Sequence, residues 1–257
     1  AASWDKNKMS ASTGAVHAVL ETNGLCEPAR GRADHPAELL GDDHAGTSSE
    51  TPLRPDAFVL SDEEKIAAIE PLFGQIMDIL GLDRKDDSLS GTPHRVAKMY
   101  VQEIFRGLNP ANRPVCRSFD NVYQYSEMLV ERNITVNSTC EHHFLPIVGR
   151  AHVAYFSSGR VVGLSKLNRV VDHFGRRPQV QERLTRQICE ALHHELNTED
   201  VAVIVDAKHM CVSCRGIGDE ASSTLTADYR GAFRKPETRR EFLEHVRAGE
   251  CVPCSSR

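Results

Sequence analysis

Three segments with β-branched residues at alternate positions constrain the fold more than any other feature of this sequence. They are "MLVERNITVNS" at 128–138, "IVGRAHVAYF" at 147–156 and "VAVIVDAKHMCV" at 201–212. Alternation with a period of two is typical of strands that bury one face. Together with the helical segments around them, these strands predict an α+β fold with helices collected on one side of a largely antiparallel sheet.

The segment before the strands is predicted to be helical. A capping box runs from Ser61 to Glu64 and opens the first helix. Apolar residues then recur every three or four positions: Ile66, Ile69, Phe73, Ile76 and Leu80. Pro71 lies inside this stripe, so we expect a kink or two short helices. A second helix should start at Thr92-Pro93, with Thr92 as its cap, and run to about Gly107.

Three further helices are expected after the second strand. The first two place apolar residues on one face: Leu167, Val170, Val171 and Phe174, and then Val180, Leu184, Ile188, Ala191 and Leu192. Near the end of the chain, Thr238 and Glu241 form another capping box, which opens a helix through Phe242 and Val246.

Composition divides the chain into one main domain and two tails. Residues 1–57 are rich in Ala, Gly, Ser, Asp, Glu and Pro without a sustained period, and we expect a disordered tail there. The main domain is predicted at 58–248, with a helical part at 58–110 and a strand-bearing part at 111–248. Residues 249–257 form a short C-terminal tail.

Charge and cysteine usage argue against a nucleic-acid-binding protein and against a disulfide-stapled one. The net charge of −5 argues against nucleic acid as a partner, because affinity for a phosphate backbone needs a concentrated basic face. No apolar run is long enough to span a membrane. The 8 cysteines are spread along a chain too long to need disulfide staples. We therefore expect a soluble cytoplasmic protein that uses thiolates as metal ligands.

Four residues could hold a metal ion. "STCEHHF" contains Cys140 and His143 at the spacing of a zinc half-site, and "CVSC" supplies Cys211 and Cys214. All four together would form a closed structural site. Strand alternation argues against this, because Cys211 shares the parity of His209 whereas Cys214 has the opposite parity. The two pairs are also farther apart than in compact zinc ribbons. We therefore predict three ligands, Cys140, His143 and Cys211, and one coordination position open to water.

An open position is typical of catalytic zinc. The metal lowers the pKa of bound water to about 7, which supplies a hydroxide nucleophile near neutrality. His142 and His209 lie beside the ligands in sequence. A lone histidine is usually a satisfied polar residue, but two imidazoles flanking an open zinc site favour general acid/base roles.

A candidate anion site lies between the two halves of the metal site. "GLSKLNR" places Ser165 at an expected helix N-cap, with Lys166 and Arg169 one turn apart. A helix N-terminus with two cations suits a phosphate, and Arg215 could add a third cation. The alternative is an ordinary solvated basic face.

The next helix begins with a candidate recognition pair, Gln181 and Glu182. A carboxylate in this position is favoured by the helix dipole alone. The functional interpretation is that Glu182 accepts from a donor–donor edge such as that of guanine, while Gln181 supplies complementary groups.

Four motifs in this order resemble the GTP cyclohydrolase I family of zinc enzymes, which opens folate and tetrahydrobiopterin biosynthesis. They are "STCEHHF", "GLSKLNRVVDHFGRRPQVQERLT", "AKHMCVSCRGI" and "TRREFLEHVR", and the resemblance covers about 60–248, including "GTPHRVAKMYVQEIFRGL". It implies a tunnelling fold (T-fold), in which the sheets of several subunits join into a barrel. Two rings of five subunits would form a homodecamer, with active sites between subunits and GTP as substrate.

The resemblance also implies a role for each residue singled out above. The ligands of one zinc ion per subunit are Cys140, His143 and Cys211. The triphosphate is held by Lys166, Arg169 and Arg215. Glu182 anchors the guanine beside Gln181. Ser165, His142 and His209 form the catalytic group, with Ser165 near the ribose.

The implied reaction is hydrolysis of GTP at purine C8. An activated water attacks C8 while His209 assists at N7, the imidazole ring opens, and a second hydrolysis releases C8 as formate. His142 is the candidate proton donor to the ribose ring oxygen. After an Amadori rearrangement, ring closure gives 7,8-dihydroneopterin triphosphate.

Two other interpretations compete with this one. The first is a structural Cys3His zinc protein that acts as a binding module, with Cys214 as the fourth ligand. The second is a different enzyme on the T-fold, such as a pterin aldolase, a pterin synthase or a nitrile reductase. A zinc nucleobase deaminase is disfavoured, because the H-x-E and P-C-x-x-C pair is absent from the sequence.

Overall fold

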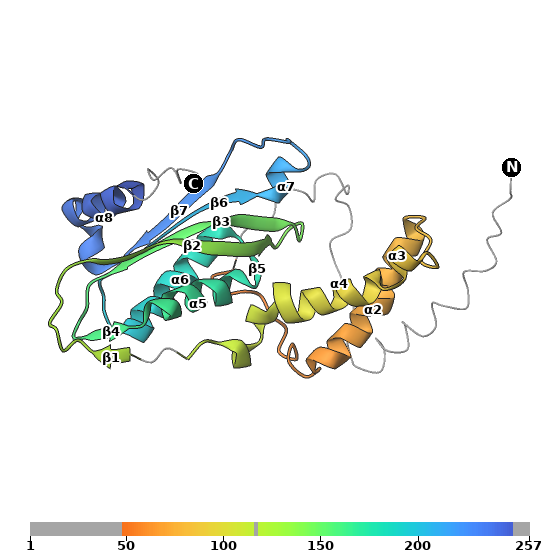
Figure 1. Ribbon diagram of the computed structural model, residues 1–257, viewed down its shortest axis with the longest axis horizontal. Coiled ribbons are helices and arrows are strands. Elements are labelled where there is room, and N and C mark those ends of the chain that lie inside the picture. The colour runs from red at the N-terminus through yellow and green to blue at the C-terminus, as the bar shows by residue number, and fades with distance from the viewer. Residues whose placement is uncertain (1–47, 116–117, 249–257) are drawn as a thin grey trace, which may run out of the picture. The chain divides into compact units, whose positions relative to one another are not determined.

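The computed structural model describes residues 48–115 and 118–248, and the account that follows is confined to them (Figure 1). The predicted tails lie largely outside these ranges. Residues 48–57, which we expected to belong to the first tail, make hydrogen bonds to a helix of the main domain. The Ser48 carbonyl accepts from Arg183 Nε at 2.9 Å, and Glu50 Oε2 accepts from Gln187 Nε2 at 3.0 Å.

A five-stranded sheet forms the centre of the fold, with strand order β5-β2-β3-β6-β7 (Figure 1). Its strands are β2 (Leu129–Cys140), β3 (Pro146–Tyr155), β5 (Pro178–Gln179), β6 (Val201–His209) and β7 (Thr224–Tyr229). All neighbours pair antiparallel except β2 and β5, which are parallel. A separate antiparallel pair is formed by β1 (Ser118–Asp120) and β4 (Arg160–Val162). The predicted strands and their largely antiparallel arrangement are confirmed.

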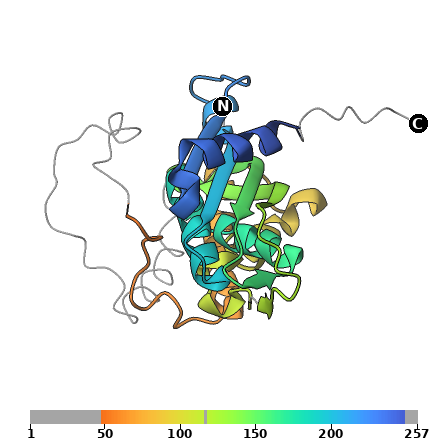
Figure 2. The ribbon, with the colours of Figure 1, turned by 90° about the vertical axis from the view of Figure 1, so that its left-hand side faces the viewer.

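Alternation along the strands divides the core between the two faces of the sheet. Val201, Val203 and Val205 point to the face covered by α5 (Leu164–Gly175) and α6 (Gln181–Leu196). Ala202 and Ile204 point to the opposite face, where they meet Phe242 of α8 (Pro236–Ala248). Figure 2 shows α8 on one side of the strands and the paired helices on the other. The predicted α+β fold is confirmed, with α5 and α6 on one side and α8 as an addition on the other.

The segment before the sheet is helical, as predicted. It contains α2 (Asp62–Ile79), α3 (Asp87–Ser90) and α4 (Thr92–Met99). The Ser61–Glu64 capping box opens α2. Pro71 does not divide α2 into two helices, because buried residues on both sides of it, Ile66 and Met77, anchor the two halves.

The second predicted helix changes its geometry before it ends. Gly91, and not Thr92, is its N-cap. From Tyr100 the chain forms a π-helical turn, Tyr100–Ile104, in which the Phe105 N–H bonds the Tyr100 carbonyl at 2.9 Å. The rings of Tyr100 and Phe105 stack 5.5 Å apart, which favours this wider turn. Short 3₁₀ turns follow at Arg106–Leu108 and Pro110–Asn112.

Two other predicted caps are wrong for the same physical reason. Gly163, and not Ser165, is the N-cap of α5, because the Gly163 carbonyl already accepts from the Lys166 N–H at 2.8 Å. Likewise, α8 begins at Pro236, and the Lys235 carbonyl accepts from the Arg239 N–H at 3.0 Å, so Thr238 lies inside the first turn. The backbone becomes helical one residue before Ser165 in α5 and two residues before Thr238 in α8.

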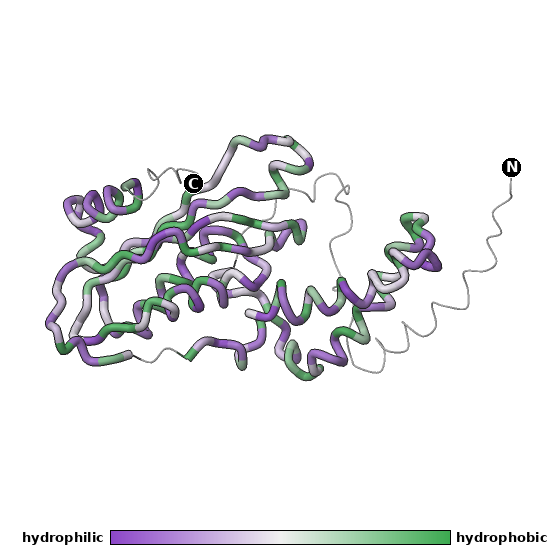
Figure 3. The backbone as a smooth tube through the Cα atoms, in the orientation of Figure 1, coloured by the Kyte–Doolittle hydropathy of each residue, from purple (hydrophilic) through white to green (hydrophobic). Residues whose placement is uncertain are grey.

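Figure 3 colours the backbone by hydropathy. Hydrophobic and hydrophilic residues alternate along the helices, and the strands carry hydrophobic stretches. None of the helices in the described ranges is both long and apolar enough to cross a membrane.

Candidate metal centre and active site

The loop between β2 and β3 brings Cys140 and His143 to one side of the chain. The Phe144 N–H bonds the Cys140 carbonyl at 2.9 Å, which closes a helix-like turn, and the Cys140 N–H bonds the Leu145 carbonyl at 2.8 Å. Phe144 adopts a left-handed φ of 52° to complete this reversal. Residues three apart in such a turn project in the same direction, so the C-x-x-H spacing becomes a pair of neighbouring ligands.

Cys211 reaches this pair from β6 by a route that the sequence did not predict. The strand ends at His209, opposite Ile147 of β3, and Met210–Ser213 form the single turn α7. The parity argument for Cys211 and Cys214 is therefore wrong, because neither residue lies in a strand. The predicted set nevertheless comes together, since the ligand atoms of Cys140, His143 and Cys211 all lie within 4.8 Å of one another.

Cys214 lies outside this group. Its side chain is exposed, and its thiol donates to the Met210 carbonyl with an S–O distance of 2.7 Å. A closed Cys3His site, the first competing interpretation, would need this turn to unwind.

The donor set fits a zinc ion. Two thiols and one imidazole are the ligands that zinc prefers. Burial, together with the neighbouring Cys140 thiol, raises the pKa of Cys211 to about 11. Two thiolates this close would repel each other, so a divalent cation between them would stabilise their charged forms. The group of Cys140, His143 and Cys211 therefore has the ligand chemistry of a metal site.

His209 lies beside the metal group and is held by Gln181. Its Nε2 is 2.8 Å from Gln181 Oε1, and the Gln181 amide nitrogen donates to the carbonyls of Val205 at 3.0 Å and Thr224 at 2.6 Å. Because Gln181 Oε1 can only accept, His209 carries its proton on Nε2. Burial lowers the pKa of His209, and the nearby Glu182 carboxylate opposes this shift. A neutral imidazole of defined tautomer results.

His142 lies on the other side of the same group. Its Nδ1 is 3.9 Å from Cys140 Sγ, and its Nε2 is 3.7 Å from Glu141 Oε1. The His142 and His143 rings meet edge to face at 6.5 Å between centroids. The structure therefore brings both predicted catalytic histidines beside the group of Cys140, His143 and Cys211, called the Cys140 group or the metal group.

Arg183 and Glu141 are site residues that the sequence analysis missed. The Arg183 guanidinium binds the Glu141 carboxylate through two hydrogen bonds, of 2.6 and 3.0 Å. The Arg183 side chain is only 2% exposed. This ion pair attaches the ligand loop to the first turn of α6, which also carries Gln181 and Glu182. The two residues lie 42 positions apart, so no local pattern pointed to the pair.

The remaining predicted residues fall into two groups. Glu182 and Arg215 are exposed near the metal group, where Glu182 influences His209 and Arg215 influences Cys211 electrostatically. Ser165, Lys166 and Arg169 lie on the first two turns of α5. The other end of α5, at Gly175, lies against Asn137 of β2. At 1.5 Å per residue, about 15 Å of helix separates Ser165 from Gly175. Arg169, in the middle of α5, lines a pocket with Asp172 and His173 that includes none of the metal-group residues, so the α5 cations face away from the metal group of their own chain.

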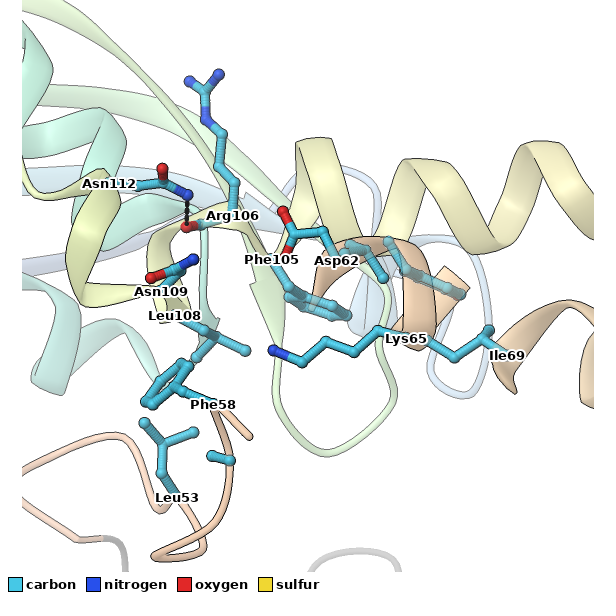
Figure 4. Close-up of a pocket in the computed structure, with 13 residues that line it drawn as sticks. Leu53, Phe58, Asp62, Lys65, Ile69, Phe105, Arg106, Leu108, Asn109 and Asn112 are labelled. Carbon is cyan, nitrogen blue, oxygen red and sulfur yellow. Dashed lines mark hydrogen bonds between the residues drawn. The ribbon is translucent and has the colours of Figure 1, made fainter. Parts of the chain in front are cut away.

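An apolar pocket elsewhere does not compete for the catalytic role. It has a volume of about 220 Å³ and lies among Leu53, Phe58, Ile69, Phe105 and Leu108 (Figure 4). Lys65 approaches the Phe58 ring, with Nζ 5.3 Å from its centroid. None of the predicted catalytic or metal-binding residues lines this pocket.

Comparison with known proteins agrees with this geometry. The sequence model of the family described as GTP cyclohydrolase I matches residues 69–247. The chain is similar to "GTP cyclohydrolase 1" of Flavobacterium johnsoniae, with 59% identity over 81% of this chain and 93% of that protein. It is also similar to proteins of the same name from Salmonella arizonae and Salmonella paratyphi B, each with 50% identity over 82% of this chain and 96% of the relative. This chain belongs to the GTP cyclohydrolase I family of hydrolases.

Proposed function

We propose that this chain catalyses zinc-dependent hydrolysis of GTP at purine C8, with release of formate and closure to 7,8-dihydroneopterin triphosphate. The observation that carries the proposal is the group of Cys140, His143 and Cys211, with ligand atoms within 4.8 Å of one another beside the neutral imidazole of His209. Membership of the GTP cyclohydrolase I family supports GTP as the substrate.

The metal group would activate water, and the neighbouring histidines, His209 and His142, would transfer protons. Zinc bound by these three residues would supply Lewis acidity and an ionisable water. His209 keeps Nδ1 as the ring nitrogen that can exchange a proton with the substrate, because Nε2 is engaged by Gln181. His142, beside Cys140, remains the candidate donor to the ribose ring oxygen.

Guanine recognition is assigned to Glu182, with Gln181 in a supporting role. Glu182 is exposed at the start of α6 and can accept from the guanine N1–H and amino group. Gln181 was predicted to contact the base directly. Its carboxamide is 1% exposed and already bonded on both sides, so we assign it to positioning His209.

The triphosphate is assigned to Lys166 and Arg169 of one subunit together with Arg215 of another, with Ser165 near the ribose. Lys166 and Arg169 lie on α5, which a single chain keeps apart from its own metal group. Sites shared between subunits account for this separation. A homodecamer of two five-membered rings is the assembly that we propose, with the cytoplasm as the compartment and a pteridine or folate precursor as the product.

Incubation with GTP tests the proposal. We expect stoichiometric formate and a product that becomes fluorescent on oxidation, both lost after zinc chelation and restored by zinc. Another enzyme of the same fold would release no formate. Replacement of Cys214 by Ser should preserve both bound zinc and formate release, whereas loss of the metal in this variant would support the closed structural site.

A further inference from the structure

A second group of metal-ligating side chains lies at the C-terminal end of α6. Glu190, His193 and His194 each offer one ligand atom, and these atoms all lie within 4.8 Å of one another. Their spacing of three and four residues puts them on one side of the helix. Within the described ranges, this and the Cys140 group are the two clusters with such geometry.

Hydrogen bonding leaves one nitrogen of His193 available to a ligand. Its Nδ1 lies 2.8 Å from the Thr198 carbonyl, which can only accept, so the neutral ring carries its proton on Nδ1 and a lone pair on Nε2. Metal-binding histidines usually donate their other N–H to a carbonyl or carboxylate in this way. The Nε2 atom is 3.8 Å from Glu199 Oε1, and the Glu199 side chain is 80% exposed and free to turn toward it.

Glu190 is oriented by a neighbouring cation. Arg230 donates a hydrogen bond to Glu190 Oε2, while Oε1 lies 2.8 Å from His194 Nε2. The bond from Arg230 lowers the pKa of Glu190, so the carboxylate is ionised near neutrality. A carboxylate with one oxygen fixed by a donor and the other facing an imidazole resembles the outer-shell support of known metal ligands.

We propose that Glu190, His193 and His194 bind a divalent transition-metal ion such as Zn²⁺, with Glu199 as a fourth ligand. Imidazole nitrogen and carboxylate oxygen are ligands that zinc accepts. This site is separate from the Cys140 group and contains no thiolate. The ion would join the last turn of α6 to the turn that leads into β6. The competing explanation is an ordinary ion pair between Glu190 and a protonated His194.

Calorimetric titration of the assembled protein, already loaded with one zinc per chain, tests the site. We expect Zn²⁺ at about pH 7.5, above the usual histidine pKa of about 6.5, to bind as one further equivalent per chain. His194→Ala should abolish this second event, and its exposed side chain makes misfolding a minor concern. Arg230→Gln should weaken it about tenfold through loss of the outer-shell bond.

His245→Ala is the matched control, because His245 also lies four residues after a glutamate, Glu241, on a surface helix. This variant should bind the second equivalent as the parent does. Cobalt gives an independent signal, since Co²⁺ added to the zinc-loaded protein should show no thiolate-to-metal absorption. Absence of a second equivalent in the parent protein, or equal binding by the parent and His194→Ala, would overturn the proposal.

Discussion

At the scale of single residues, the candidate site depends on side chains held in one protonation state and one orientation. Gln181 defines the tautomer of His209 through a 2.8 Å hydrogen bond, and burial keeps that imidazole neutral. The candidate metal group consists of Cys140, His143 and Cys211 and does not include either His142 or His209. Binding of zinc and transfer of protons can therefore be separated by substitution.

Replacement of His209 by Ala should leave zinc content unchanged and reduce formate release by about 10²–10⁴-fold, the usual contribution of a general acid or base. Metal analysis and a formate assay on the same sample measure the two effects. His209→Gln keeps a donor that can reach Gln181 Oε1 but has no ionisable nitrogen, and it is the conservative comparison. If His209→Ala loses zinc, the residue is a ligand.

Replacement of Arg169 by Ala should weaken binding of GTP far more than binding of guanosine. A charge-assisted bond to a phosphate contributes about 1.5–3 kcal/mol, or roughly a 10- to 100-fold loss of affinity for GTP. Equilibrium binding of both ligands makes the comparison. Equal losses for the two ligands would remove the assigned role in triphosphate binding.

At the scale of elements, polar contacts with little exposure join the β2–β3 loop to α6, and α5 to the 3₁₀ turn at Arg106–Leu108. The Arg183–Glu141 pair holds the ligand loop on α6. His173 of α5 accepts from the Arg177 guanidinium at 2.7 Å and is 5% exposed. Arg177 also donates to the Gly107 carbonyl at 2.8 Å, which ties α5 to the turn that follows α4.

Replacement of Arg183 by Met should lower the free energy of unfolding by about 1–3 kcal/mol, because the Glu141 carboxylate, whose side chain is only 17% exposed, loses its partner. It should also speed the loss of zinc to a chelator, since the loop that carries Cys140 and His143 is freed. Denaturant unfolding and chelator kinetics measure the two effects. Arg240→Met, an exposed substitution on α8, is the control. Glu141→Gln in the Arg183→Met background should recover part of the stability, and no recovery would contradict the ion-pair explanation.

Acidification should destabilise the fold through His173. Burial and the nearby Arg177 and Arg113 charges lower the pKa of His173 to about 4. The unfolded chain, with a histidine pKa of about 6.5, therefore binds this proton first, and stability falls as pH drops from about 6.5 to about 4. The loss attributable to this residue approaches about 3 kcal/mol at pH 4. His173→Gln should reduce the fall in the free energy of unfolding between about pH 6.5 and about pH 4. The difference between parent and variant at each pH is the measurement, because effects of zinc loss then cancel.

At the scale of the whole molecule, one chain keeps the two proposed halves of the site apart. The metal group lies at the ends of β2 and β6, whereas Lys166 lies in the first turn of α5 and Arg169 lines a pocket that includes no metal-group residue. A symmetric ring that repeats one interface would bring the α5 of one subunit to the metal group of the next. Apolar residues of α2 that are exposed in the single chain, such as Ile79 at 83%, agree with burial in an assembly.

Mixing two inactive variants tests the shared site. Cys140→Ser removes a proposed metal ligand and Arg169→Ala removes a proposed phosphate contact, so each homogeneous assembly should be nearly inactive at GTP concentrations well below those that saturate the Arg169→Ala variant. Subunits dissociated, mixed in equal amounts and reassembled should regain about a quarter of the parent activity, because about one site in four then combines two intact halves. No recovery after confirmed subunit exchange would show that each site belongs to one chain.

Local patterns determined the three long strands, the main helices, the fold class and the Cys140–His143 half of the metal group. The period of two in β6, the apolar stripes of α5 and α6 and the C-x-x-H spacing of Cys140 and His143 are all properties of neighbouring residues. Propensity and periodicity act over such short distances and can be recognised in sequence. The helix starts at Leu164 and Pro236 were missed because Ser165 and Thr238, one and two residues later, have side chains that are typical of N-caps.

Tertiary structure alone decided which distant groups meet. The Gln181–His209 bond and the Arg183–Glu141 pair depend on how α6 packs against the sheet. The meeting of Cys211 with Cys140 depends on the pairing of β6 with β3 and on the turn that follows β6. These contacts join residues far apart in the chain, and their energies depend on burial, which no local pattern encodes. For the same reason, the separation of the α5 cations from the metal group became visible only in the folded chain.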